Sequence, residues 1–254
     1  MRLCIVFALT ALLCACAGMT RAPRELPWST AQQLVLVITP DWNSSRGVLR
    51  TYARVGRDWQ GAGASVPVVI GRNGAAWGLG LHSPQTDGPI KREGDGRSPA
   101  GVFAIGTAFG YAASQSVALS YRALADDDYC IDVSTSPLYN RLVAARDVGA
   151  AAVAGSTEPM RRDIHFNGDE AYKVGFVIEH NPHGTPNAGS CIFAHLWKSA
   201  DSATSGCTAM AEPVMRDLLH WLQPQQRPVF VLLPDAVYRR LRADWQLPDI
   251  AEKN

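Results

Sequence analysis

A mainly β domain, built as a sandwich or a barrel with a few peripheral helices, is the fold class that the sequence predicts. Many short runs of β-branched and apolar residues are separated by glycine and proline, which is the pattern of short strands joined by turns. Only two segments have the apolar spacing of amphipathic helices. Strands do not alternate with helices, and this argues against a doubly wound parallel sheet.

The composition is that of one globular domain with short extensions. The chain has 254 residues, of which 47% are hydrophobic and 19% charged, so it is long enough to bury a sizeable core. Its net charge is +1 and its basic residues form no cluster, so we expect no nucleic-acid partner. The sequence gives no indication of an oligomeric state. We divide the chain into residues 1–15, 16–30, a domain over 31–234, and a C-terminal helix and tail over 235–254.

The first segment has the pattern of a bacterial signal peptide. An apolar run from Leu3 to Ala17 is too short to span a bilayer. It ends in Leu-Cys-Ala-Cys, with leucine at −3 and alanine at −1 of Cys16, which is typical of lipoprotein processing with Cys16 as the lipidated residue. Residues 16–30 would then be a tether. This predicts a membrane-anchored lipoprotein of the cell envelope that faces the periplasm, with the outer membrane of a Gram-negative bacterium as its site. Cleavage after Ala15 or Ala17 by ordinary signal peptidase is the alternative.

The first half of the domain is expected to consist of strands. Each strand is a short β-branched or alternating run, and most end at a glycine or proline. In chain order these strands are Gln33–Pro40, Gly47–Arg57, a third near Trp59, Val66–Ile70 and Ala75–Leu81. Lys91–Val102 is rich in glycine, aspartate, serine and proline, so it is predicted to be a loop, and Phe103–Phe109 resumes an extended pattern.

The second half contains further strands and both expected helices. The strands are Tyr129–Val133, Ala171–His180, Ser190–Leu196 and Pro228–Leu233. Ala211–Leu222 is predicted to be a helix because Pro213 stands in its first turn and its apolar residues form a stripe. Asp235–Trp245 is the second helix candidate.

One stretch has the residues that a thiol nucleophile requires. The run Ser190–Trp197 brings His195 to the end of a strand, and Cys207 follows twelve residues later, directly after Gly206. A thiol attacks as the thiolate, and a nearby histidine can remove its proton. We therefore predict Cys207 as the nucleophile, His195 as general base and acid, and the backbone at Gly206 as part of an oxyanion hole. The structural alternatives are a half-buried histidine and a buried or disulfide-bonded cysteine.

Three cysteines lie outside the predicted signal peptide and its processing site. They are Cys130, Cys191 and Cys207. An exported chain meets an oxidising compartment, where three cysteines suggest one disulfide and one free thiol. The sequence allows all three pairings, and we favour Cys130–Cys191 with Cys207 free. Alternatively, Cys130 and Cys191 are small buried residues.

Two separated segments resemble the L,D-transpeptidase catalytic (YkuD-type) family. Gly94–Phe103 (GDGRSPAGVF) and Phe109–Tyr111 are similar to an early segment of that family. Ser190–His195 with Ser205–Cys207 is similar to its histidine, which is followed about a dozen residues later by a Gly-Cys motif. The resemblance extends from about Val66 to Leu233, which is most of the mature chain.

The resemblance implies the family's mainly β fold and a cysteine acyltransferase that acts on peptidoglycan stem peptides. It implies that Cys207 attacks the L,D peptide bond before the terminal D-residue of a tetrapeptide stem, and that His195 protonates the leaving D-alanine. An amine of a second stem or of an envelope protein then accepts the acyl group, giving a 3→3 crosslink or protein attachment. No metal or organic cofactor is implied. With water as the acceptor, the same residues would make an L,D-carboxypeptidase or amidase. A non-catalytic peptidoglycan-binding lipoprotein is the alternative from another class.

The residue that binds the substrate carboxylate departs from the family pattern. That pattern commonly has an arginine two residues after the cysteine, whereas this chain has Ala209. Arg97 is therefore our candidate for the carboxylate clamp, although a structural role in its loop is equally consistent with the sequence. Ser205 and Thr208, which flank the Gly-Cys pair, are the other substrate-binding candidates.

A second histidine fits the family pattern by its tripeptide alone. His183-Gly184-Thr185 spells the His-Gly-Thr that often contains the catalytic histidine. It lies 24 residues before Cys207, inside a loop rich in proline, glycine and asparagine. We favour His195 because it ends a strand at the shorter spacing.

Overall fold

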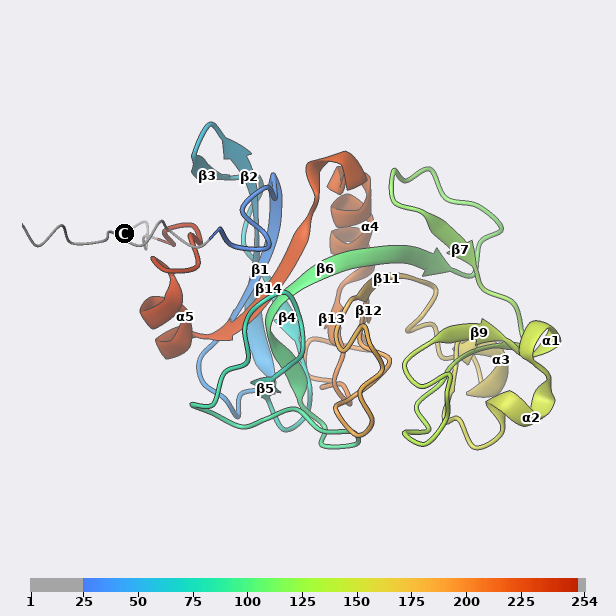
Figure 1. Ribbon diagram of the computed structural model, residues 1–254. Helices are drawn as coiled ribbons and strands as arrows, with labels where there is room; N and C mark the ends of the chain where they lie inside the picture. The colour runs from blue at the N-terminus through green and yellow to red at the C-terminus, as the bar shows by residue number, and fades with distance from the viewer. Residues whose placement is uncertain (1–24, 251–254) are drawn as a thin grey trace, which may run out of the picture.

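In the computed structural model, which describes residues 25–250, eight strands form a closed barrel (Figure 1). The barrel closes because the first strand pairs with the second as well as with the last. Around the barrel the order is β1 (Gln33–Thr39), β14 (Val229–Pro234), β6 (Ser98–Gly110), β11 (Val174–Ile178), β12 (Phe193–Leu196), β13 (Thr208–Met210), β4 (Val66–Val69) and β2 (Arg46–Val55). The prediction of a mainly β fold with few helices is confirmed, and of the two predicted architectures the structure has the barrel.

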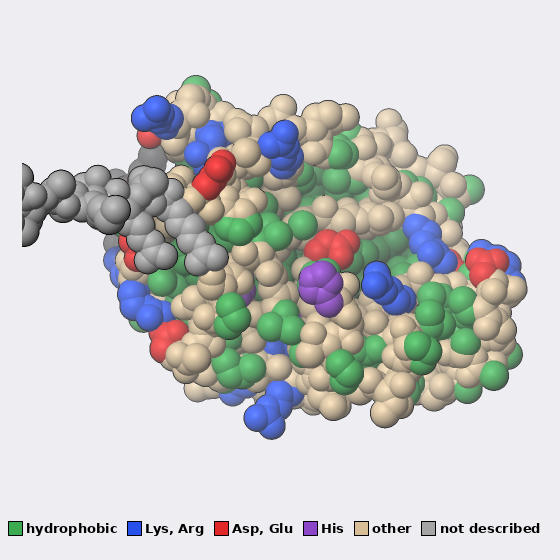
Figure 2. Space-filling view, in the orientation of Figure 1, with side chains coloured by type: hydrophobic (Ala, Val, Ile, Leu, Met, Phe, Trp, Pro, Cys, Tyr) green, Lys and Arg blue, Asp and Glu red, His purple; other side chains and the backbone are tan. Residues whose placement is uncertain are grey.

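The remaining elements are short and lie at the edges of the barrel. Three short strands pair with strands of the barrel: β3 (Asp58–Gly61), β5 (Ala75–Trp77) and β7 (Tyr121–Ala123). From β7 the chain continues to the side of the molecule. The helices of the second half are α4 (Glu212–Trp221), the 3₁₀ helix Pro224–Gln226 and α5 (Asp235–Leu241). On the face that Figure 2 shows, charged side chains of both signs are scattered over the surface.

The main hydrophobic core joins the barrel to both helices of the second half. Strand β1 is buried along its whole length, which explains its continuous apolar sequence. Helix α4 buries Met215, Leu218 and Leu219, and Val214 packs partly buried against the same core, so its predicted apolar stripe faces the core. Helix α5 contributes Val237 to the same core.

The folded domain is wider than the predicted range of 31–234. Trp28, in the last part of the predicted tether, is buried, and its Nε1 donates a hydrogen bond to Trp245 O at 3.0 Å. Helix α5 and the turn that follows it belong to the same core. The predicted signal peptide, Cys16 and most of the tether lie outside the described residues. Within residues 25–250, no helix is long and apolar enough to cross a membrane.

The loop predicted over Lys91–Val102 is wrong in its second half, because β6 already begins at Ser98. This part of β6 pairs with β5 on one side and β14 on the other. Its small residues serve close packing: a Cβ on Gly101, whose φ is 139°, would lie 1.8 Å from His82 Nε2. Glycine is needed here because the His82 ring lies close to the backbone, and not because the chain turns.

A side lobe, defined here as residues 124–170, lies beside the barrel (Figure 1). It contains a three-stranded sheet in the order β10-β8-β9 and three one-turn helices. Their bounds are β8 (Asp128–Cys130), β9 (Leu142–Ala144), α1 (Ala145–Val148), α2 (Ala150–Val153), β10 (Glu158–Pro159) and α3 (Arg162–His165). A second, smaller hydrophobic cluster joins the side lobe to the outer face of the barrel. It consists of Phe109, Leu124, Cys130, Met160, Tyr172, Cys191, Phe193 and Cys207.

Candidate active site

Cys207 and His195 line one cavity of about 720 Å³. The cavity lies between the side lobe and the parallel pair β12–β13 of the barrel, and the nucleophile loop 202–207 forms part of its rim. The smaller hydrophobic cluster supports its floor, because Cys207 and Tyr172 belong to both. The site therefore depends on the contact between the two parts of the fold.

The strand register places the two predicted catalytic residues on the same face. In the parallel ladder His195 lies opposite Ala209 and Ala194 opposite Thr208. Because successive side chains alternate between faces, Cys207 projects to the same face as Ala209 and His195, diagonally across the ladder. From strand spacing and rise, their Cα atoms are separated by about 8 Å. Side chains at this separation can reach each other.

His195 is held as a neutral imidazole with a defined orientation. Its Nδ1 donates to Leu196 O at 2.8 Å, so Nε2 carries the free lone pair. Burial lowers the pKa of His195 to about 4. The ring of Tyr172 packs edge-on against the imidazole, with 5.2 Å between ring centroids. At neutral pH this side chain can therefore act as a general base.

Cys207 is the free cysteine of the described residues, and it is held as a thiol. Burial, together with the charge of the nearby Glu158 carboxylate, raises the pKa of Cys207 to about 12. The sulfur accepts a hydrogen bond from Phe193 N–H at 3.3 Å and donates to Cys191 O at 3.5 Å. The proton is thus directed to the Cys191 carbonyl, and a rotation of the thiol about its Cβ–Sγ bond is needed before it can be given to another acceptor.

Hydroxyl groups fix the backbone of the nucleophile. Ser98 Oγ accepts Gly71 N–H at 3.0 Å and donates to Cys207 O at 3.0 Å, so it joins β6 to the nucleophile loop. Thr204 Oγ1 donates to the same carbonyl at 2.6 Å and accepts Gly206 N–H at 3.1 Å. The predicted oxyanion donor at Gly206 is therefore occupied by Thr204 in this state. Sequence reasoning did not assign Ser98 or Thr204 to the site, although both lie within or beside the segments that carry the resemblance.

Arg97 is not part of the cavity, which corrects the prediction of a carboxylate clamp there. Its Nη1 donates to Trp42 O and Ala75 O, each at 2.9 Å, and its Nη2 donates to Asn43 Oδ1 at 3.0 Å. The guanidinium thus joins the loop at Trp42 and Asn43 to strand β5. Arg97 therefore has a structural role, which is the alternative to a carboxylate clamp that the sequence allowed. Arg97 O lies close to the nucleophile loop, 3.1 Å from where a Cβ on Gly206 would stand.

Thr208 is also outside the cavity, which corrects its prediction as a substrate-binding residue. It follows Cys207 directly, so its side chain projects to the opposite face of β13, and it is only 1% exposed. Ser205, in contrast, lines the cavity, and its Oγ accepts a hydrogen bond from Arg72 Nη1 at 3.1 Å. Gly206 lines the cavity as well.

The other histidines lie away from the cavity lining. His183 is exposed in the loop that the Asn181 side chain organises through Thr185 and Gly189. His180 is buried, accepts Leu79 N–H with Nδ1 and donates to Ala188 O with Nε2, which is a structural arrangement. The choice of His195 over His183 therefore agrees with the geometry.

The side lobe contributes a charged network that sequence reasoning missed. Tyr172 donates its hydroxyl proton to Glu158 Oε1 at 2.7 Å, and Arg162 bridges Glu158 at 3.2 Å and Asp169 at 3.0 Å. Burial raises the pKa of Glu158. Together with Asp132, these carboxylates form an acidic wall of the cavity, which we define as Asp132, Glu158 and Asp169. No motif or spacing distinguishes them, since only the folding of the side lobe brings them to the nucleophile.

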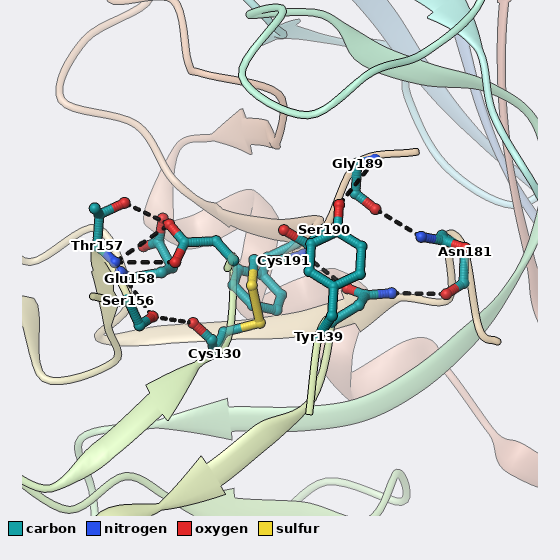
Figure 3. Close-up of a disulfide and its surroundings, with 12 residues drawn as sticks. Cys130, Tyr139, Ser156, Thr157, Glu158, Asn181, Gly189, Ser190 and Cys191 are labelled. Atoms are coloured by element: carbon teal, nitrogen blue, oxygen red, sulfur yellow. Dashed lines mark hydrogen bonds between the residues drawn. A yellow bond between two sulfur atoms is a disulfide. The ribbon is translucent and has the colours of Figure 1, made fainter. Parts of the chain in front are cut away.

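The predicted disulfide between Cys130 and Cys191 is confirmed (Figure 3). It connects the end of β8 to the segment that enters β12, across 61 positions of sequence. Cys191 adopts a left-handed conformation with φ of 56°, and its N–H donates to Asn140 Oδ1 at 2.8 Å. This turn shortens the predicted strand over Ser190–Leu196, which begins only at Phe193.

The barrel and its cavity define the class of site: a candidate thiol-dependent active site in which a neutral histidine lines the same cavity as the cysteine. Within residues 25–250, no three His, Cys, Asp or Glu side chains are grouped to hold a metal ion. Comparison of the chain with protein-family models, with curated proteins and with solved structures finds no match. The function is therefore argued from the site and from the resemblance of its two sequence segments.

Proposed function

We propose that this chain is a peptidoglycan L,D-transpeptidase, a cysteine acyltransferase that forms a thioester with a tetrapeptide stem. The observation that supports this most is the joint presence of a free Cys207 and an oriented, neutral His195 in one cavity. A structural cysteine needs no histidine with its Nδ1 fixed and its Nε2 left open. The proposed lipid anchor at Cys16 would hold the enzyme to a membrane of the envelope, near peptidoglycan.

The acylation step follows from the protonation states. Because the thiol and the imidazole are both neutral, His195 Nε2 takes the proton while Cys207 Sγ attacks the carbonyl carbon before the terminal D-residue. The resulting imidazolium gives this proton to the nitrogen of the leaving D-alanine as the C–N bond breaks. One C–S bond forms, one C–N bond breaks, and the histidine returns to its neutral form.

The acceptor step reverses the direction of proton transfer. An amine of a second stem or of an envelope protein attacks the thioester carbonyl and loses a proton to His195. The thiolate leaves and takes the proton back, so the enzyme is regenerated. With water in place of the amine the product is a tripeptide stem, and the same residues act as an L,D-carboxypeptidase.

Product analysis tests the proposal. The full-length protein is incubated with purified disaccharide tetrapeptide, and the products are separated and identified by mass spectrometry. We expect 3→3 crosslinked dimers with release of D-alanine, and neither product with Cys207→Ala. A tripeptide stem as the main product would instead identify a carboxypeptidase.

The alternative, a non-catalytic peptidoglycan-binding lipoprotein, predicts binding without release of D-alanine. If wild type and Cys207→Ala both bind peptidoglycan equally and neither releases D-alanine, the protein is a peptidoglycan-binding lipoprotein and the proposed activity is wrong. His183→Gln serves as a matched control for His195→Gln, because His183 is exposed outside the cavity lining. We expect D-alanine release to be retained by His183→Gln and lost with His195→Gln.

A further inference from the structure

Four cationic side chains line the cavity, and three of them already have acidic partners. Lys91 pairs with Asp95, Arg162 with Glu158 and Asp169, and Lys198 with Asp169 at 3.5 Å. The fourth is Arg72, which has no ion pair with any carboxylate of residues 25–250. Its charge is therefore available to a ligand in the cavity.

Arg72 is held beside the nucleophile by contacts on two sides. Its N–H donates to Thr204 O at 2.8 Å, which attaches its backbone to the nucleophile loop. Its Nη1 donates to Ser205 Oγ at 3.1 Å, two residues before Cys207. A Cβ on Gly96, whose φ is 68°, would lie 3.1 Å from the Arg72 guanidinium carbon, so the side chain lies closely over this glycine. Because these contacts already restrict the side chain, Arg72 loses less conformational entropy on binding a ligand than an unrestrained arginine would.

The chemistry of this corner of the cavity selects an anion. A guanidinium has five N–H donors in a planar fork that matches a carboxylate, and Ser205 accepts from only one of its nitrogens. Ser205 Oγ can in turn donate its own proton to a ligand oxygen. The acidic wall also lines the cavity, but its Glu158 and Asp169 are paired with Arg162 and Lys198, so these two cations are less available to a ligand than Arg72. Ala209, buried on the strand, carries no charge.

We propose that Arg72, supported by Ser205, binds the C-terminal carboxylate of the acyl donor and so restricts the enzyme to stems with a free terminal residue. This rests on the proposed function, since the ligand is its acyl donor. The terminal α-carboxylate belongs to the residue whose nitrogen leaves, so it is separated from the scissile carbonyl by a few bonds only. Arg72 is hydrogen-bonded to Ser205, two residues before Cys207, and all three residues line the cavity.

A binding measurement tests this without requiring turnover. Full-length Cys207→Ala is titrated by calorimetry with a tetrapeptide stem that ends in a free carboxylate, and with the same peptide as its C-terminal amide. The titrations are repeated with Arg72→Gln added and with Arg92→Gln added. Arg92 is an exposed arginine of the next loop that does not line the cavity, so it matches the change in net charge.

We expect Cys207→Ala to bind the carboxylate peptide at least about tenfold more tightly than the amide. Arg72→Gln is expected to abolish this preference and to leave the affinity for the amide unchanged, which also shows that the cavity is still folded. Arg92→Gln is expected to keep the preference.

Each other outcome contradicts one proposal or both. If Arg72→Gln keeps the preference for the carboxylate while wild type still releases D-alanine, the role of Arg72 is wrong and the proposed function stands. If Arg72 confers the preference but wild type forms no thioester, the carboxylate site stands and the transpeptidase is wrong. If neither peptide binds, both proposals are overturned.

Discussion

At the scale of single residues, Cys207 keeps its proton and His195 is neutral. Burial holds the pKa of Cys207 at about 12 and the pKa of His195 at about 4, so the pair is a thiol with a neutral imidazole. A preformed thiolate–imidazolium pair would need both pKa values shifted the other way. In the proposed mechanism the thiolate is therefore generated only as the carbonyl is attacked, and at neutral pH the thiol reacts slowly with other electrophiles.

The pH dependence of alkylation tests this protonation state. We expect the rate at which iodoacetamide alkylates Cys207 to rise with pH and not to level off below pH 10, because the thiolate fraction keeps increasing up to the raised pKa. Peptide mass mapping measures the rate at this position, and Cys207→Ala defines the background. A plateau at pH 6–7 would mean a thiolate stabilised by His195 and would contradict the mechanism.

The sequence could predict the candidate nucleophile and base, which line one cavity, but it could not predict the direction of the neighbouring side chains. Cys207 and His195 were predictable because few residue types do this chemistry and the spacing joined a strand to a turn. Thr208 was assigned to the site by adjacency, yet a shift of one position along a strand moves a side chain to the other face. Arg97 was assigned by its charge, and its hydrogen bonds to loop carbonyls depend on a fold that the sequence pattern does not specify.

At the scale of elements, the side lobe completes the site. It supplies the acidic wall and covers the cysteine, while His195 lies in β12 and Cys207 directly precedes β13. The disulfide between Cys130 and Cys191 fastens the side lobe to the strand that carries His195. Cys191 O also accepts the thiol proton, so this bond lies directly beside the nucleophile.

Removal of the disulfide is expected to loosen the site. For the Cys130→Ser/Cys191→Ser variant we expect the free energy of unfolding to fall by about 2–4 kcal/mol, because the unfolded chain regains the freedom of a long loop. Hydrogen exchange should accelerate in β8 and β10, and alkylation of Cys207 should become faster as its cover loosens. Unchanged exchange in these strands and unchanged alkylation would mean that the side lobe holds its position without the disulfide.

The strands of the barrel could largely be predicted, whereas in the side lobe the sequence indicates only β8, through the predicted strand Tyr129–Val133 that overlaps it. The barrel strands have continuous or alternating apolar sequences because the core covers them. The side-lobe strands have two or three residues each, too few for a period to appear, and they exist only through tertiary pairing. The residues of the acidic wall were missed for this reason.

At the scale of the whole molecule, folding buries two histidines in different surroundings. His195 lines the cavity, while His180 is enclosed between loops, and burial lowers the pKa of each to about 4. In the unfolded chain both would titrate near pH 6.5. Between pH 6.5 and 4 the unfolded chain therefore binds protons that the folded protein does not, and stability must fall as the pH falls.

Chemical denaturation at two pH values tests this linkage. We expect His180 to lower the free energy of unfolding by about 2 kcal/mol between pH 7 and pH 5. The drop should be smaller by about this amount in His180→Gln, and of wild-type size in His183→Gln, the exposed control. An equal drop in both variants would show that His180 does not stay neutral in the folded protein.

The most direct test of the central claim is the mass of the intact protein after brief mixing with tetrapeptide stem. A thioester at Cys207 adds the mass of the stem without its terminal D-alanine. We predict this adduct in wild type, its removal by hydroxylamine, its absence in Cys207→Ala, and strong reduction in His195→Gln. An unmodified wild-type mass under conditions where the peptide binds, or an adduct that persists in Cys207→Ala, would contradict acyl transfer by this cysteine.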